Sequence, residues 1–240
     1  FAAAGAGICV AKHGNRAMSS RCGSADVLKA LGVNIEATPE VVSACLDDAG
    51  IGFLFAPMLH GAMKHAIGPR REIGTRTVFN VLGPLTNPAG AKRQLIGVFA
   101  ADLTATLAGV LRDLGSARAF VVHGSDGLDE ITVSGPSQIS ELDNGEVTTY
   151  EISPEEFGMS PAAADSLKGG DADENAQLLQ EILDGAEGPR RDVVLLNAAA
   201  AIAAGDAAAS LSEGVERARE SIESGKAKAA LQNLQRVSNQ

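Results

Sequence analysis

The chain is poor in cysteine. Its 240 residues include only Cys9, Cys22 and Cys45, an odd number without the close spacing of a metal-binding motif. This argues against a disulfide framework and a cysteine-based metal centre, and it predicts free thiols in a reducing compartment, the cytoplasm. Cys22 lies in a polar loop, where we expect an incidental small residue rather than a reactive thiol.

Long apolar runs are also missing. The longest, residues 193–204, is too short to cross a bilayer and is interrupted by Asn197. No segment has the pattern of a signal peptide. The sequence therefore predicts a protein without a membrane partner.

Positive charge is scarce: the chain has 20 basic and 30 acidic residues, and its net charge is −10. Such a balance argues against a nucleic-acid-binding surface. The first half of the chain nevertheless holds most of the basic residues, and a locally positive cleft on an acidic protein suits a small polyanionic substrate. The basic residues gather in two clusters, which are Lys12, Arg16 and Arg21, then Lys64, Arg70, Arg71 and Arg76.

Apolar content and periodicity indicate the fold class. With 45% apolar residues, the chain can bury a full core in one large domain over residues 1–240. Short apolar segments alternate with longer helical patterns, which predicts an α/β fold with a mainly parallel central sheet flanked by helices. Individual elements are predicted as helices over 39–49, 102–114 (capped by Asp102), 173–184, 189–204, 211–224 and 226–235, as strands over 52–56, 95–99, 119–123 and 131–134, and as a hairpin over 137–152 that turns at Asn144-Gly145.

The most informative segment is a polar loop over residues 12–26, between an apolar strand at 8–11 and a helix that continues from Val27. In α/β proteins such a loop binds anions, because unpaired backbone N–H groups and the positive end of the helix dipole point toward it. Gly14 and Gly23 let a ligand approach the backbone closely. Composition alone leaves a plain tight turn open as the alternative. The side chains suited to phosphate oxygens are Lys12, Arg16, Ser19, Ser20 and Ser24.

Three segments resemble, in order, the anthranilate phosphoribosyltransferase family, which has the glycosyltransferase family 3 fold of the class II nucleoside phosphorylases. They read KHGNRAMSSRCGSAD over residues 12–26, TRTVFNVLGPLTNP over 75–88 and HGSDGLDE over 123–130. The similarity runs from the first residue nearly to the last. It implies transfer of the 5-phosphoribosyl group from 5-phosphoribosyl 1-diphosphate to anthranilate, with release of pyrophosphate, in tryptophan biosynthesis.

Two other functions stay open at this point. Pyrimidine nucleoside phosphorylases share the fold and a similar first loop, although residues 75–88 favour the transferase. The second alternative is a non-catalytic paralogue that binds nucleic acid, and the negative net charge argues against it.

The resemblance also implies which residues bind the two substrates. The arylamine is already neutral at pH 7, so we expect no catalytic general base. Arg70 is the candidate for the anthranilate carboxylate, since a guanidinium fork matches a planar carboxylate. The implied anthranilate residues are Asn15, His60, Arg70 and Gly83. Those implied for 5-phosphoribosyl 1-diphosphate are Lys12, His13, Gly14, Asn15, Arg16, Ala17, Met18, Ser19, Ser20 and Ser24.

Asp129 and Glu130 are the candidate metal ligands. From the residues alone, an acidic pair beside a turn is usually solvated. The match of HGSDGLDE to the family's metal loop implies a Mg²⁺ site, and Mg²⁺ commonly bridges one or two carboxylates to substrate phosphates. His123, at the start of that segment, is expected to be a structural hydrogen-bonding residue.

The beginning of the chain reads as the last turns of a helix that ends in glycine. The family carries a further N-terminal part, with a GTGGD phosphate loop that is not in this sequence. We therefore expect a chain that lacks an N-terminal segment and is inactive by itself. We also expect residues 57–85 to form a short helical insertion that belongs to a smaller α-helical domain and packs with that segment, and the full-length protein to be a homodimer.

Overall fold

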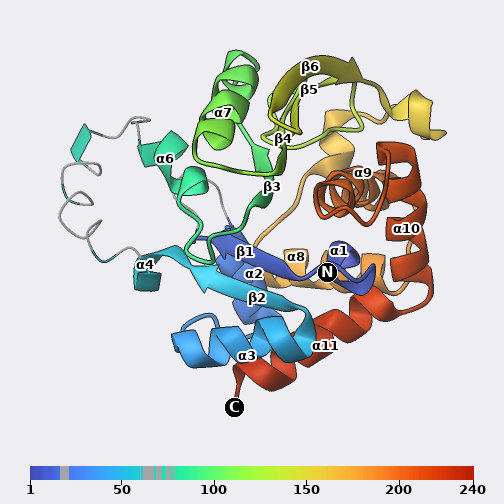
Figure 1. Ribbon diagram of the computed structural model, residues 1–240. Coiled ribbons are helices and arrows are strands. Elements are labelled where there is room, and N and C mark those ends of the chain that lie inside the picture. The colour runs from blue at the N-terminus through green and yellow to red at the C-terminus, as the bar shows by residue number, and fades with distance from the viewer. Residues whose placement is uncertain (17–21, 60, 62–67, 69–71, 74–76, 78) are drawn as a thin grey trace. The chain divides into compact units, whose positions relative to one another are not determined.

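The computed structural model describes the chain except for residues 17–21, 60, 62–67, 69–71, 74–76 and 78 (Figure 1). The chain divides into two compact units. Unit 1 comprises Phe1–Ile8, Ala91–Gly169 and Leu178–Ala230, and unit 2 comprises Cys9–Gly90, Gly170–Gln177 and Leu231–Gln240. Much of the helical insertion predicted over residues 57–85 lies outside the described residues.

Unit 2 is built on a parallel pair of strands, β1 (Val10–Gly14) and β2 (Ile51–Phe55). All five residues of β2 are buried. The helix α3 (Pro39–Ala49) packs on β2, and its Leu46 lies over Gly52, where a Cβ would come within 2.9 Å of the leucine side chain. The hydroxyl of Thr38 accepts from the Val41 N–H and Gly50 ends the helix with φ 68°, so the predicted start and end of this helix are confirmed.

Three more helices of unit 2 follow β1 or β2 in the sequence. α2 (Ser24–Ala30) follows the loop after β1, and α4 (Ala56–Leu59) follows β2 directly. α6 (Phe79–Leu85) lies in the segment 75–88, called here the second segment, and contains Pro84. The packing of residues 57–85 against an N-terminal helical segment stays a prediction.

Unit 1 contains a four-stranded sheet in the order β3-β4-β5-β6. β3 (Arg93–Gly97) and β4 (Arg118–Gly124) are parallel, β5 (Ser137–Asp143) is antiparallel to β4, and β6 (Glu146–Ile152) is antiparallel to β5 (Figure 1). Consecutive residues of β4 are buried, which requires a cover on both faces of the strand because its side chains alternate. Two helices contact β4: α7 (Asp102–Asp113), which connects β3 to β4, and α9 (Pro189–Ala204). The α/β class with parallel pairing is confirmed.

The remaining helices of the C-terminal part match the predicted ranges closely. α9 spans the predicted residues, α10 (Leu211–Glu223) packs against it, and Gly214 lies so close to the Ala199 backbone that a Cβ would come within 2.7 Å. Among the described residues, no helix has the length and apolar character needed to span a membrane. The other elements are α1 (Ala2–Gly5), α8 (Ala172–Leu183), α11 (Lys226–Ser238) and the 3-10 helices η2 (Pro154–Phe157) and η3 (Ala164–Leu167).

Two local predictions were wrong, and both errors have a physical reason. Residues 131–134 form no strand, because side chains take up their backbone groups: the Thr132 N–H donates to the Ser137 hydroxyl, and the Ser134 N–H to the Thr132 hydroxyl. Asp102 does not cap α7. It is the first residue of the helix, and the preceding Ala101 carbonyl accepts from the Thr104 hydroxyl.

The predicted hairpin is confirmed. Asn144 and Gly145 have φ angles of 48° and 82°, the two positive values that a type I′ turn requires. We expect Gly145→Ala to lower the free energy of unfolding by about 1–2 kcal/mol, because an L-residue is strained in this conformation. The matched control is Gly109→Ala in α7, where a Cβ meets no atom within 4 Å and alanine favours the helix by roughly 0.5–1 kcal/mol. Denaturant unfolding measures both, and equal effects would contradict the assignment.

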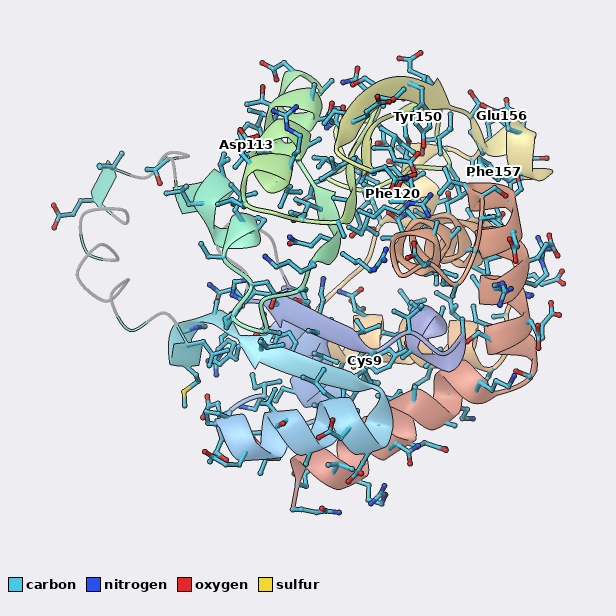
Figure 2. The ribbon with its side chains drawn as sticks, viewed as in Figure 1. Cys9, Asp113, Phe120, Tyr150, Glu156 and Phe157 are labelled. Carbon is cyan, nitrogen blue, oxygen red and sulfur yellow. The ribbon has the colours of Figure 1, made fainter. Side chains whose placement is uncertain are left out.

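A partly buried charge cluster occupies one end of the unit 1 sheet. The Arg118 guanidinium donates to Glu141 at 2.8 Å and to the Ala203 carbonyl at 2.9 Å, and it lies 5.4 Å from the centre of the Phe120 ring. The hydroxyl of Tyr150 donates to the other oxygen of Glu141 at 2.8 Å. Tyr150, Phe120 and Phe157 gather here (Figure 2), around a cavity of about 360 Å³. Since Arg118 and Tyr150 satisfy Glu141, this cluster ties β4, β5 and β6 together.

The cluster predicts an unusual titration for Tyr150. Burial raises the pKa of Tyr150, and the hydrogen bond to Glu141 and the charge of that carboxylate raise it further, against a smaller opposing effect of Arg118. The folded state thus holds the phenol proton more tightly than the unfolded state, whose tyrosine titrates near about pH 10. The stabilisation is therefore complete below that pH and is lost as the pH rises above it.

Near-ultraviolet absorbance of tyrosinate measures this directly, because Tyr150 is the one tyrosine of the chain. We expect no tyrosinate signal at about pH 10 while the protein is folded. Glu141→Gln should move the signal to lower pH, since it removes the negative charge beside the phenol. Glu151→Gln is the control, because neighbouring side chains on a strand point to opposite faces. A normal titration of folded wild-type protein would contradict this account.

Candidate functional site

The first candidate loop begins where β1 ends, and its start is packed closely against α2. A Cβ on Gly14 would lie 2.7 Å from the Phe53 ring and 2.9 Å from the Ser24 hydroxyl oxygen, so only glycine fits without a shift. The Ala25 N–H donates to the Asn15 carbonyl at 3.3 Å. The predicted residues Gly14, Asn15 and Ser24 are thus brought together in unit 2.

The start of α2 leaves the Ser24 side chain available. Gly23 is the N-cap residue, and the Asp26 carboxylate accepts from the Gly23 N–H at 3.0 Å. The hydroxyl of Ser24 is therefore not used as the helix cap. A hydroxyl beside the end of β1 at a helix N-terminus is suited to a phosphate oxygen.

The two described cations of this loop differ in their surroundings. Lys12 is exposed on β1 and makes no hydrogen bond or ion pair with another residue in the described part of the chain. Arg16 pairs with Glu36 at 3.1 Å and lies 5.6 Å from the centre of the Phe55 ring. Both side chains of the Arg16–Glu36 pair are about half exposed, and exposed pairs are worth only about 0–1 kcal/mol. The pairing therefore does not prevent Arg16 from meeting an anion.

Asn87 joins the second segment, residues 75–88, to the strand that precedes the first loop. Sequence reasoning did not identify this residue. The Asn87 amide donates to the Ala11 carbonyl at 3.0 Å, one residue before Lys12. This bond fixes the end of the segment that contains Gly83 next to β1. Among the described residues, no atom lies within 4 Å of the position that a Cβ on Gly83 would take. Ala17, Met18, Ser19, Ser20, His60 and Arg70 lie outside the described residues.

The acidic loop of unit 1 follows β4 and lies against the end of β3. A Cβ on Gly97, the last residue of β3, would come within 1.5 Å of the Asp129 carbonyl oxygen, so only glycine admits the loop at this place. Asp129 and Glu130 are exposed, whereas the next residue, Ile131, is buried. Nothing in the sequence indicated this contact, because Gly97 and Asp129 lie far apart along the chain.

Asp126 organises the interior of this loop. Its carboxylate accepts from the Leu128 N–H at 3.2 Å and from the Thr132 hydroxyl at 2.6 Å. The Gly124 N–H closes the turn by donating to the Leu128 carbonyl at 2.9 Å. Asp126 is therefore a loop-forming residue, and it is exposed like Asp129 and Glu130 at the end of the loop.

His123 has the structural role predicted for it. Its Nδ1 donates to the Val98 carbonyl at 2.8 Å, which ties β4 to the residue after β3. This bond and the Gly97 contact hold the same two strand ends together. The acidic loop thus begins at two strand ends that are held together.

The chemistry of the described loops is that of anion and hard-cation binding. Exposed carboxylate oxygens suit Mg²⁺, and within the described ranges no three His, Cys, Asp or Glu side chains gather as a complete protein-only metal site. Cys22 donates weakly to the Gly23 carbonyl, and Cys9, Cys22 and Cys45 are all reduced thiols. The geometry thus offers phosphate donors in unit 2 and a carboxylate pair in unit 1.

Comparison with known proteins identifies the family. Residues 1–228 match the glycosyl transferase family, a/b domain. The anthranilate phosphoribosyltransferase of Moorella thermoacetica is 58% identical over 234 residues, which cover 98% of this chain and 69% of the relative. The crystal structure of the Thermus thermophilus enzyme is 46% identical, with a TM-score of 0.94, over 100% of this chain and 71% of that one.

The enzyme of Saccharomyces cerevisiae extends the comparison to bound ligands. Its structure in complex with PRPP and Mg is 29% identical to this chain, with a TM-score of 0.88, and the match covers 99% of this chain and 68% of that one. The same yeast enzyme has been solved with 4-fluoroanthranilate. By this similarity over nearly its whole length, the chain belongs to the anthranilate phosphoribosyltransferases, a group of enzymes within the glycosyl transferase family.

Proposed function

We propose that this protein transfers the 5-phosphoribosyl group from 5-phosphoribosyl 1-diphosphate to the amino group of anthranilate and releases pyrophosphate. The observation that carries the proposal is the 58% identity to a curated anthranilate phosphoribosyltransferase over 98% of the chain. The complexes of the yeast relative with PRPP and Mg and with 4-fluoroanthranilate support the choice of both substrates. No comparable support exists for phosphorolysis of nucleosides or for nucleic-acid binding.

The first loop binds the phosphoribosyl diphosphate. Lys12 presents an exposed ammonium at the edge where β1 ends, and Ser24 presents a hydroxyl at the start of α2. Both stabilise negative charge, which grows on the departing diphosphate as its bond to C1 of the ribose breaks. His13, Gly14, Asn15 and Arg16 adjoin them along the chain, and Ala17, Met18, Ser19 and Ser20 complete the proposed set from the resemblance.

The nucleophile needs little help from the protein. The anthranilate amine is neutral at pH 7 and attacks C1 directly, so its orientation in line with the leaving group is the main requirement. Arg70 holds the anthranilate carboxylate in a bidentate pair, and Asn15, His60 and Gly83 line the ring. The Asn87 bond to β1 supports this division, since it fixes the Gly83 segment beside the phosphate loop of the same unit.

Asp129 and Glu130 would hold Mg²⁺. They fit this ion because both are exposed on a loop whose backbone is fixed at Gly97, and their oxygens are the hard ligands that Mg²⁺ prefers. When bound, Mg²⁺ neutralises charge on the diphosphate. The two carboxylates would orient the ion and leave most of its coordination positions to phosphate oxygens and water.

Cysteine chemistry and the family resemblance bear on cellular location and assembly. The three reduced thiols agree with a reducing compartment, and we place the reaction in the cytoplasm on that basis. The homodimer implied by the family resemblance stays a prediction. Sedimentation of the protein at several concentrations would test it.

The reaction itself gives the first functional prediction. With the full-length protein, the fluorescence of anthranilate should fall only when both 5-phosphoribosyl 1-diphosphate and Mg²⁺ are present, and an excess of EDTA should stop the loss. Asp129→Asn should raise the Mg²⁺ concentration needed for half-maximal rate, because one anionic ligand is gone. Turnover that persists in EDTA, or release of base from thymidine or uridine by inorganic phosphate, would refute the proposal.

A pair of arginine variants separates the two substrate subsites. Arg70→Ala should weaken the binding of anthranilate by about 1.5–3 kcal/mol, the scale of a charged hydrogen bond, and should change the binding of the diphosphate little. Arg71→Ala, at the neighbouring position, is the control and should change the KM for anthranilate much less. Steady-state kinetics with each substrate varied in turn measures both effects. Equal losses for the two substrates would show that the pocket is wrongly divided.

A further inference from the structure

The acidic loop is held at its backbone by a side chain of α9. The amide of Asn197 pairs with both backbone groups of Ile131: its Oδ1 accepts from the Ile131 N–H at 3.0 Å, and its Nδ2 donates to the Ile131 carbonyl at 2.8 Å. Ile131 directly follows the carboxylate pair in sequence. The helix thus holds the residue from which the pair extends.

The amide itself has a fixed orientation. Its Nδ2 also donates to the Val193 carbonyl at 2.9 Å, one turn earlier in α9. An amide nitrogen has two donors, and both are used, so a flip of the amide would break all three bonds. The Asn197 side chain therefore fixes the backbone of the loop at Ile131 relative to α9.

The loop depends on this contact because Ile131 lies in no strand, so no neighbouring strand supplies hydrogen bonds to its backbone N–H and carbonyl. Ile131 is 1% exposed, so water does not readily replace the amide at its backbone groups. Removing one partner of a buried hydrogen bond leaves the other unsatisfied, which forces the backbone to move toward new partners. On the other side of the pair, the Asp129 carbonyl lies against Gly97 and has no room to move in that direction.

We infer that Asn197 is a positioning residue for magnesium: through the backbone of Ile131 it sets where Asp129 and Glu130 present their oxygens. This inference rests on the proposed function, which supplies the metal. Asn197 touches neither metal nor substrate in this account. Partners of this kind, one step behind the metal ligands, typically change metal affinity by about 10–100-fold when they are removed.

Binding of Mn²⁺ alone, followed by electron paramagnetic resonance of the free ion, tests the inference without turnover. Asn197→Ala should raise the Mn²⁺ dissociation constant by about tenfold or more. In the assay, the Mg²⁺ concentration for half-maximal rate should rise by a similar factor, while the rate at saturating Mg²⁺ changes little. A purely structural role would lower stability and leave both metal constants unchanged.

The chain offers a matched control in Asn175, whose amide makes the same two-bond pair with the backbone of one residue, Gly170. Asn175→Ala should lower the Tm much as Asn197→Ala does and leave the Mn²⁺ dissociation constant unchanged. If Asn197→Ala does not fold, Asn197→Asp replaces it. That variant keeps the acceptor for the Ile131 N–H, loses the donor, and should still weaken Mn²⁺, although its added negative charge alone would strengthen cation binding.

The outcomes separate the two proposals. Unaltered Mn²⁺ binding in the Asn197 variant, with Mg²⁺-dependent turnover in the unaltered protein, overturns the positioning role and leaves the proposed function intact. Equal weakening in the Asn175 control overturns it as well. Failure of the unaltered protein to bind Mn²⁺ and to need Mg²⁺ for turnover overturns both.

Discussion

In each unit, one candidate loop depends on a strand end at which no Cβ can be accommodated. Gly14 ends β1 against the Phe53 ring and the Ser24 hydroxyl, and Gly97 ends β3 against the Asp129 carbonyl. In each unit the glycine lies at the carboxyl end of a strand in a parallel pair, which is where open α/β sheets bind their ligands. The absence of a side chain lets the following or neighbouring loop pack on the strand end itself. Loop position is thereby set by the sheet rather than by flexible side chains.

The two ends of β4 in unit 1 differ in how their charged side chains are arranged. At one end Arg118 is satisfied by Glu141 and the Ala203 carbonyl, and this end carries the tyrosine whose pKa is raised. At the other end Gly124 begins a turn whose last two residues are exposed carboxylates. Charge that is paired within the protein supports the sheet. The exposed carboxylates at the opposite end are the ones proposed to bind an ion.

The sequence predicted what short-range chemistry determines. Thr38-Pro39 and Asn144-Gly145 were correct because a helix cap and a type I′ turn involve only neighbouring residues. The strand predicted at 131–134 failed because side chains take the backbone bonds that a strand would need: Ser137 and Thr132 within the segment's own surroundings, and Asn197, 66 residues away, at Ile131. Gly97 and Asn87 also escaped sequence reasoning, because their partners lie far along the chain. The site residues themselves came from a match of whole segments, which carries three-dimensional information that periodicity lacks.

The surroundings of Arg16 explain how a loop on an acidic protein stays ready for an anion. Its guanidinium lies near Phe55 and pairs with Glu36, so the side chain is ordered before a ligand arrives. The pair is exposed, and an exposed pair contributes only about 0–1 kcal/mol, whereas a guanidinium forms charge-assisted, often bidentate, bonds with phosphate. In the proposed complex, exchange of Glu36 for a phosphate would therefore give up only a weak ion pair. Under that proposal, an acidic partner close to this loop does not block the cation.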